Sequence, residues 1–577
     1  MSSYFDEASL VMIPSGYKDQ KVYSVKPLDG SGDLTFSRAS SATRVASNGL
    51  IEKVRTNLAL YSQDWTNWTL FQATATANTT ANPLDGAVNA DTLTISTSTT
   101  GVSYRSVATG TAVATFSVYL KAGTHNIAQI GFTDGVDYAV NVNLTLGTIT
   151  GVSSGITGTI TSVGSGWYRV TATRTISTTS TPNAFVNVIV GTVGSTIIVF
   201  GAQVELGDIA TDYIATTSAA VSVGPVSGLP RLDYLNSTCP RLLLEPQRSN
   251  LATYSEQADQ YTKAGATIGS NVAVSPDGYT NADSIIEDSA NSPHAFYNFG
   301  LTTFSATAYT LSIFAKKGGR DWIRLSLYDG TAPSAYFNLN TGAIGTTSGV
   351  TAKIENYGSG WYRCSVTATM SAVSGGIAVY SASADGIDTY VGTNGLAATY
   401  FYGWQLELGA YATSYIPTLG AAVTRGADVC SKSGISSILP TQTGTLYVEF
   451  DWQKTPADVP VLSIHNNSTG LAWIQKINST TTQGTYFASG YIGSINGTVS
   501  ASAGIVKVAY AWTNGRQALY INGVQAGTAT AAITDSNDFS IFEFNGFWGI
   551  QNIGTSIASA LVFPTALSNS DLAALTA

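Results

Sequence analysis

The chain of 577 residues is too long for one hydrophobic core, since cores stop growing near about 250–300 residues, so we expect three or four domains. Only 11% of the residues are charged, the net charge is −9 and no basic run occurs, which argues against a nucleic-acid partner. No apolar stretch approaches the ~18 residues of a membrane span, and the N-terminus has no signal-peptide core, so we expect neither membrane insertion nor secretory export.

The composition favours β-structure. Thr, Ser, Asn and Gly take the solvent-facing positions that charged residues usually occupy, and the β-branch of Thr suits a pleated surface. No window has a sustained apolar period of 3.6, so long helices are not expected. Cys239, Cys364 and Cys430 are widely spaced and form neither a disulfide framework nor a metal knuckle, which fits synthesis in a reducing cytoplasm.

Residues 1–56 precede the repeated part of the chain and form an N-terminal segment. Asn48-Gly49 stands between apolar runs and predicts a tight β-hairpin. The segment is interpreted as a structural connection to the first module, with contacts to another protein as the alternative.

One module is used twice. NLALYSQDW matches NLATYSEQAD, TFSVYLKAG matches TLSIFAKKG, and GSGWYRVTAT matches GSGWYRCSVTAT. ADTLTI also matches ADSIIE, and GAQVELG matches GWQLELG. All five pairs occur in the same order along the chain, with offsets between 192 and 202 residues. The sequence therefore predicts two homologous β-sandwiches of jelly-roll type at 57–218 and 250–428, joined by a collar segment at 219–249.

A different module occupies 429–577. RQALYINGVQAG predicts a strand, an Asn-Gly turn and a second strand. ALSNSDLAALT predicts a short closing helix capped by Ser568 or Asn569. The fold class expected for the whole chain is all-β, with tandem β-sandwich domains.

Three stretches resemble known families. The run from LVMIPSGYKDQ through ASNGLIEKV resembles the N-terminal region of many bacteriophage virion proteins. LLLEPQRSNLATYSE and the later GWYR and GWQLELG…YIPT phrases resemble phage carbohydrate-binding-like modules. LYINGV, with the final strand and helix, resembles concanavalin A-like (laminin G-like) domains.

The resemblance implies a fibre, spike or decoration protein on the virion surface, head or tail, made in the host cytoplasm. It implies that residues 1–56 attach the protein to other virion proteins. It also implies a homo-oligomer, a trimer if the protein is a fibre.

No enzymatic motif is complete. Glu449 and Asp451 lie two residues apart, so a strand would place both on one face. Glucanases of concanavalin A-like fold need a further Glu shortly afterwards, and WQKT follows here instead. His125, His294 and His465 lack metal-ligand spacing. We therefore expect no catalytic residues, and a polysaccharide depolymerase with a site between subunits remains an alternative.

Residues that recur in both copies favour structural roles. Trp167 and Trp361 each begin a strand after Gly-Ser-Gly and are expected to pack into a core. Glu205 and Glu407 occupy matching places in QVELG and QLELG, where a packing or turn role serves both copies equally.

Glycan binding is the predicted function because low charge leaves aromatic side chains as the prominent surface chemistry. Sugar rings present apolar C–H faces that stack on aromatic rings, and their hydroxyls need polar partners. Loops carry function on rigid scaffolds, so aromatic residues in loop sequences are the candidates. The candidate glycan-binding residues are Trp65, Trp68, Trp322, Tyr328, Phe547 and Trp548.

No cofactor is required by this function. Asp535, Asn537 and Asp538 have a spacing that would suit Ca²⁺, although such Asp-Asn clusters more often form plain turns. The expected function is adhesion of a virion protein to host cell-surface glycans. A purely structural head or tail component that binds other virion proteins is the alternative.

Overall fold

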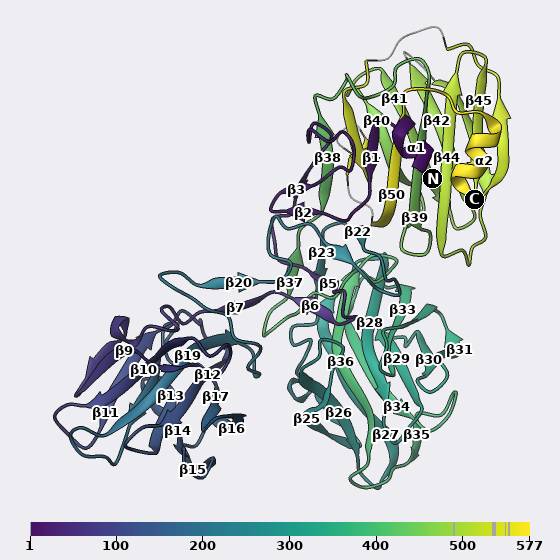
Figure 1. The fold of residues 1–577 in the computed structure, drawn as a ribbon. Helices are drawn as coiled ribbons and strands as arrows, with labels where there is room; N and C mark the ends of the chain where they lie inside the picture. The colour runs from purple at the N-terminus through teal and green to yellow at the C-terminus, as the bar shows by residue number, and fades with distance from the viewer. Residues whose placement is uncertain (1, 489–490, 534–537, 548–549, 552–553) are drawn as a thin grey trace.

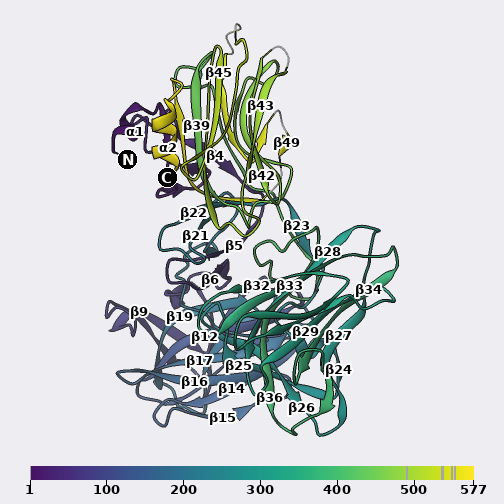
Figure 2. The ribbon, with the colours of Figure 1, turned by 90° about the vertical axis from the view of Figure 1, so that its right-hand side faces the viewer.

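The chain folds into three β-sandwiches, which confirms the predicted all-β class (Figure 1). The computed structural model describes residues 2–488, 491–533, 538–547, 550–551 and 554–577. Two sandwiches are the repeats, and the third carries both ends of the chain, which lie close together in Figures 1 and 2. No helix in the described residues is long and apolar enough to cross a membrane.

The first repeat packs two six-stranded antiparallel sheets face to face. One sheet contains, in spatial order, β16 (Thr157–Gly164), β17 (Trp167–Thr175), β12 (Val113–Ala122), β19 (Thr196–Leu206), β10 (Val88–Ile95) and β9 (Ala73–Ala81). The other contains β15 (Thr148–Val152), β14 (Val136–Asn143), β13 (Ile127–Asp134), β18 (Asn183–Val188), β11 (Gly101–Ser106) and β8 (Thr69–Phe71).

The second repeat has the same topology, as the duplication predicts. Its first sheet contains β32 (Thr351–Asn356), β33 (Trp361–Thr369), β28 (Ala308–Lys317), β36 (Ala397–Leu408), β26 (Thr280–Glu287) and β25 (Ala266–Val274). Its second contains β31 (Ala343–Ser348), β30 (Ser334–Asn338), β29 (Trp322–Tyr328), β34 (Ser374–Ala382), β27 (Asn291–Thr303) and β24 (Thr262–Ala264), with β35 (Thr389–Val391) beside β27.

The third sandwich is larger and gathers strands from distant parts of the chain. Its nine-stranded sheet contains β2 (Tyr17–Lys18), β3 (Lys21–Val22), β4 (Leu34–Ser37), β38 (Val429–Ser433), β47 (Ile541–Phe544), β40 (Val459–His465), β41 (Gly470–Asn478), β42 (Thr481–Ala488) and β43 (Tyr491–Thr498). Its eight-stranded sheet contains β21 (Leu232–Asp233), β22 (Arg241–Leu244), β50 (Thr555–Phe563), β39 (Gly444–Asp451), β44 (Ile505–Thr513), β45 (Arg516–Ile521) and β46 (Val524–Ala529), with β1 (Leu10–Met12) paired to β50.

Residues 1–56 therefore do not form a separate segment in the structure. β1 pairs with β50 and β4 pairs with β38, so the start of the chain completes both sheets of the 429–577 module. The collar residues of β22 also pair with β50. The physical reason is that sheet edges present unpaired backbone groups, which these short strands satisfy.

The short elements lie close to where the sequence places them. β5 (Thr43–Val45) and β6 (Ile51–Lys53) form the hairpin at Asn48-Gly49, but its loop spans 46–50 rather than two residues. Asn522-Gly523 is a two-residue turn between β45 and β46, with positive φ at both positions. Helix α2 (Asn569–Thr576) begins after Ser568, whose hydroxyl accepts a hydrogen bond from the Asp571 N–H.

Two short pairings connect the modules: β7 (Arg55–Asn57) with β20 (Val221–Val223), and β23 (Arg248–Asn250) with β37 (Val423–Arg425). A third small sheet, β48 (Gly546–Phe547) with β49 (Ile550–Gln551), lies within the 429–577 module. α1 (Ser2–Glu7) precedes β1 at the N-terminus.

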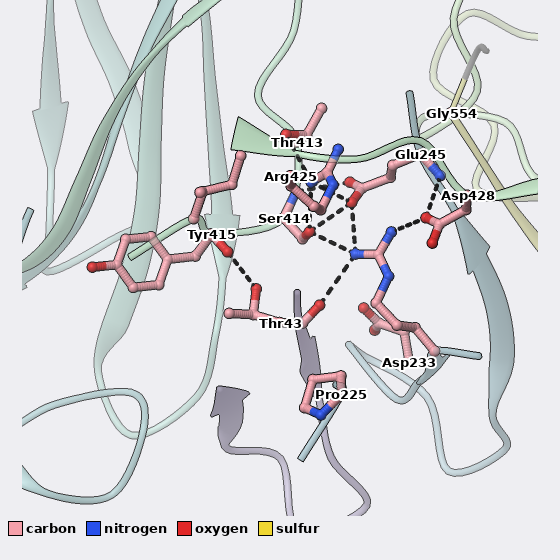
Figure 3. Close-up of polar contacts among 12 residues, drawn as sticks. Thr43, Pro225, Asp233, Glu245, Thr413, Ser414, Tyr415, Arg425, Asp428 and Gly554 are labelled. Carbon is pink, nitrogen blue, oxygen red and sulfur yellow. Dashed lines mark hydrogen bonds and ion pairs between the residues drawn. The ribbon is translucent and has the colours of Figure 1, made fainter. Parts of the chain in front are cut away.

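A buried ion network, here called the hub, joins these connecting segments (Figure 3). Arg231 donates to Glu245 at 2.7 Å and also pairs with Asp428. The second oxygen of Asp428 accepts a hydrogen bond from Arg38 at 3.0 Å. Arg425 lies 2.9 Å from the same Glu245 oxygen. The hub thus takes charged groups from the N-terminal segment, the collar and the end of the second repeat.

Asp428→Asn is expected to lower the free energy of unfolding by about 3–5 kcal/mol. The substitution removes the counter-charge of the buried Arg38 guanidinium and one of the two counter-charges of Arg231, which keeps Glu245. Chemical denaturation measures the loss, and limited proteolysis of the collar shows where the structure opens. Asp321→Asn, which breaks an exposed pair with Lys317, is the control and should change stability by less than about 0.5 kcal/mol. Equal losses in both variants would contradict the role of the hub.

Stability is expected to decrease in acid. Burial alone would raise the pKa of Glu245, but the guanidinium charges of Arg425 and Arg231 hold it well below its usual range. A carboxylate with a lowered folded-state pKa stabilises the fold above its unfolded pKa of about 4.3, and that contribution is lost as pH falls further. The difference in melting temperature between the wild type and Glu245→Gln should therefore be constant above about pH 5 and shrink progressively as the pH falls below about 4. A difference independent of pH would count against this assignment.

Candidate binding face

The outward side of the second sheet of the second repeat carries the candidate site. In β29, Ile323, Leu325 and Leu327 enter the core, so the alternate residues point away from it. These outward residues are Trp322, Arg324, Ser326 and Tyr328. Two of them, Trp322 and Tyr328, are sequence-predicted candidates, and the structure brings them onto one face, each half-exposed.

Strand register brings further side chains beside them. Tyr380 of β34 and Tyr336 of β30 stand directly opposite Arg324 on its two sides. Directly opposite residues in antiparallel strands have their side chains on the same face. In the next row, Ser326 is flanked by Ala378 and Ser334. All three small side chains of this second row are buried.

Three aromatic rings continue the face toward β27. The ring centroids of Tyr297 and Phe299 are 4.6 Å apart and nearly parallel, and those of Phe299 and Tyr328 are 4.4 Å apart. The register of β27 against β34 shifts between Asn298 and Thr302, and Phe299 lies in this irregular stretch. All three rings are half-exposed, so they offer flat apolar surface to solvent.

Arg324 supplies the polar centre of the face. Its Nη1 donates to Asp388 at 2.5 Å, and its guanidinium lies 5.0 Å from the Tyr380 ring centroid and 6.0 Å from that of Tyr336. Burial, with the nearby negative charge of Asp388, raises the pKa of Tyr336 to about 12. The phenol therefore stays neutral, and the Arg324–Asp388 pair offers both donors and acceptors without net charge. We call the outward residues Tyr297, Phe299, Trp322, Arg324, Tyr328, Tyr336, Tyr380 and Asp388 the aromatic face.

Trp65 and Trp68 do not belong to an exposed site, which corrects their selection as candidates. Trp65 is 0% and Trp68 4% exposed, and their stacked rings, 5.2 Å apart, belong to the core of the first repeat. The QDWTNW sequence forms a 3-10 turn, η1 (Trp65–Asn67), that closes one end of the sandwich. The polar residues around Trp65 and Trp68 therefore predicted a loop correctly, but they did not predict that the two rings point into the core.

Several other candidates have no described side chain. Trp548, Asp535 and Asn537 lie outside the described residues, and for Phe547 only the backbone is described. Asp538 is exposed. Within the described part of the chain, no cluster of three His, Cys, Asp or Glu side chains is arranged to hold a metal ion.

Sequence reasoning missed Tyr297, Phe299, Tyr336 and Tyr380 because it looked for aromatic residues in loops. They lie instead on strands, at alternate positions in FYNF, SAYFN and GIAVYSA. These residues could be recognised in the sequence as aromatic residues on the solvent side of a strand. That recognition requires knowing which side of the strand is buried.

The carboxylates that sequence analysis singled out have structural partners. Glu205 accepts hydrogen bonds from the Thr211 N–H at 2.8 Å, and Glu407 accepts from the Thr413 N–H at 3.0 Å. Each holds the loop that follows its strand. Glu449 lies 3.3 Å from the Ser559 hydroxyl, and Asp451 lies 3.5 Å from Arg241.

A cavity of about 150 Å³ lies elsewhere, between the second repeat, the collar and the third sandwich. Its charged lining includes Lys353, Glu355, Asp233 and Lys454, and Lys353 pairs with Glu355 at 3.0 Å. Lys454 lies 3.9 Å from Asp233. Because these opposite charges face one another, the cavity is a polar seam between modules and is separate from the aromatic face.

No family model and no curated protein matches the chain. Among solved structures, it is similar to the CBM40 of the Ruminococcus gnavus IT-sialidase bound to α2,3-sialyllactose, at 18% identity and TM-score 0.22, covering 25% of this chain and 91% of that one. It is similar to the SAP-like pentraxin of Limulus polyphemus, at 13% identity and TM-score 0.21, covering 24% and 72%. It is also similar to a botulinum neurotoxin type C structure, at 17% identity and TM-score 0.22, covering 26% of this chain and 39% of that one. These likenesses concern the β-sandwich fold alone.

Proposed function

We propose that the protein is a bacteriophage virion component that binds host cell-surface glycans through the aromatic face of the second repeat. The observation that carries the glycan part is the grouping of half-exposed rings around the Arg324–Asp388 pair on one sheet face. The virion part rests on the sequence resemblance of the N-terminal run and the repeats.

The chemistry of the face suits a sugar. The C–H faces of a pyranose stack on rings such as Tyr328 and Tyr380, and its hydroxyls bond to Arg324 and Asp388. Because its two charges cancel, the Arg324–Asp388 pair can hydrogen-bond to sugar hydroxyls without attracting counter-ions from solution. Individually weak sites become strong when several copies of the chain act together on one particle, since avidity exceeds single-site affinity by roughly 10²–10⁴.

In this proposal the third sandwich faces the particle and the repeats face the host. Residues 1–56 contact other virion proteins as part of that sandwich, whose sheets they complete. The chain ends lie on the third sandwich, away from both repeats in Figure 1. The protein acts as a homo-oligomer, binds without catalysis and needs no cofactor.

Tyr328→Ala and Tyr380→Ala are each expected to weaken glycan binding about tenfold, because each removes a ring on which a sugar stacks. Binding of the full chain to immobilised bacterial surface polysaccharides measures this effect. Tyr23→Ala, at a ring 38% exposed in the N-terminal segment, is the matched control and should bind as the wild type does.

The same samples separate the alternatives. Binding that all three variants retain would remove the aromatic face from the proposal. Adsorption to other virion proteins with no polysaccharide binding would instead support a purely structural component. Release of reducing ends from the polysaccharide would indicate a depolymerase. Treatment with EDTA is expected to leave binding and melting temperature unchanged.

A further inference from the structure

The first repeat carries different chemistry at the positions that correspond to the centre of the aromatic face. In its second sheet, Gln129 of β13 stands opposite Asn187 of β18 and Asn141 of β14. Gln129 lies 195 residues before Arg324, within the matched repeat segments. The row Asn187–Gln129–Asn141 in the first repeat thus replaces the row Tyr380–Arg324–Tyr336 in the second.

The three amides form a hydrogen-bonded chain. Asn187 Nδ2 donates to Gln129 Oε1 at 2.9 Å, and Gln129 Nε2 donates to Asn141 Oδ1 at 2.9 Å. Asn187 is 6% exposed, and its Oδ1 is buried without a hydrogen-bond partner. Leaving a buried acceptor unsatisfied costs about 1–3 kcal/mol, which a donor from a ligand would recover.

An exposed ring stands at one end of this row. Phe71 of β8 is opposite Val102 of β11, and Val102 is opposite Asn187, so all three point to the same face as the amides. Phe71 is 59% exposed. Tyr104, in the neighbouring row, is half-exposed. We call Phe71, Tyr104, Asn187, Gln129 and Asn141 the amide face.

The size and charge of the amide face define its ligand. Neighbouring strands are about 4.8 Å apart, so the three amides span about 10 Å, the length of a short oligosaccharide. Each side-chain amide has donors and an acceptor, which matches adjacent sugar hydroxyls. The row itself carries no charged side chain, unlike the Arg324–Asp388 pair of the second repeat.

We propose that the amide face is a second glycan-binding site, which takes neutral, hydroxyl-rich sugar residues. The sugar stacks on Phe71 and bonds through its hydroxyls to Gln129 and Asn141, and the unpaired Asn187 oxygen accepts one further hydroxyl. This inference extends the proposed function, because it makes the duplicated modules two sites of different specificity.

The test uses the full chain and an array of neutral oligomers of glucose, galactose, mannose and N-acetylglucosamine, with uronic-acid oligomers beside them. Gln129→Leu keeps the size of the side chain but removes its hydrogen bonds, and Phe71→Ala removes an exposed ring. Each is expected to weaken binding of neutral oligomers about tenfold. Tyr23→Ala, at an exposed ring outside both repeats, is the control and should leave that binding unchanged. Unaltered melting temperatures show that the variants fold.

The outcomes distinguish this site from the aromatic face. Wild-type protein that binds no neutral oligomer overturns the inference. Neutral binding that survives Gln129→Leu and Phe71→Ala but is lost in Tyr328→Ala also overturns it, and leaves the proposed function intact. Neutral binding lost in the first two variants, with Tyr328→Ala without effect on any glycan, supports the amide face and removes the aromatic face.

Discussion

The buried charge cluster around Asp428 is the interaction on which the arrangement of modules depends. Asp428 meets Arg38 and Arg231 where all three side chains are 0% exposed, so each charge needs the others. These residues come from parts of the chain up to 390 residues apart. Their pairing fixes how the N-terminal segment, the collar and the end of the second repeat meet. The third sandwich can then take its edge strands from the first two of these segments.

Comparison of the two repeats distinguishes the residues that stabilise the fold, which are matched, from the residues that face solvent, which differ. Asn57 and Asn250 make the same buried contacts, each donating to two backbone carbonyls of its own sandwich. Trp167 and Trp361 are both buried. These equivalences explain the matched NLA and GWYR phrases. The outward rows of the second sheets instead differ in chemistry on an unchanged frame, as expected where loops and faces carry recognition and cores carry stability.

The low fraction of charged residues in the sequence is matched by the lack of net charge on the aromatic face and on the amide face. On the aromatic face, the charge of Arg324 is balanced by Asp388, and on the amide face hydrogen bonding is supplied by neutral groups. Both arrangements favour recognition by shape, stacking and hydroxyl pairing over recognition by charge. The buried ion pairs of the hub, by contrast, serve the fold.

The sequence by itself determined the β-class, the duplication, the Asn522-Gly523 turn and the Ser568 cap, because period-two alternation, repeats and turn residues act locally. It also placed Trp322 and Tyr328 among the candidates. Only the tertiary structure decided that Trp65 and Trp68 face inward and that Tyr297 and Tyr380 join the aromatic face. Alternation states which side chains share a face of a strand, but the packing of a second sheet decides which face is buried. Likewise, no local signal places β1 beside β50, because that pairing depends on an open sheet edge more than 500 residues away.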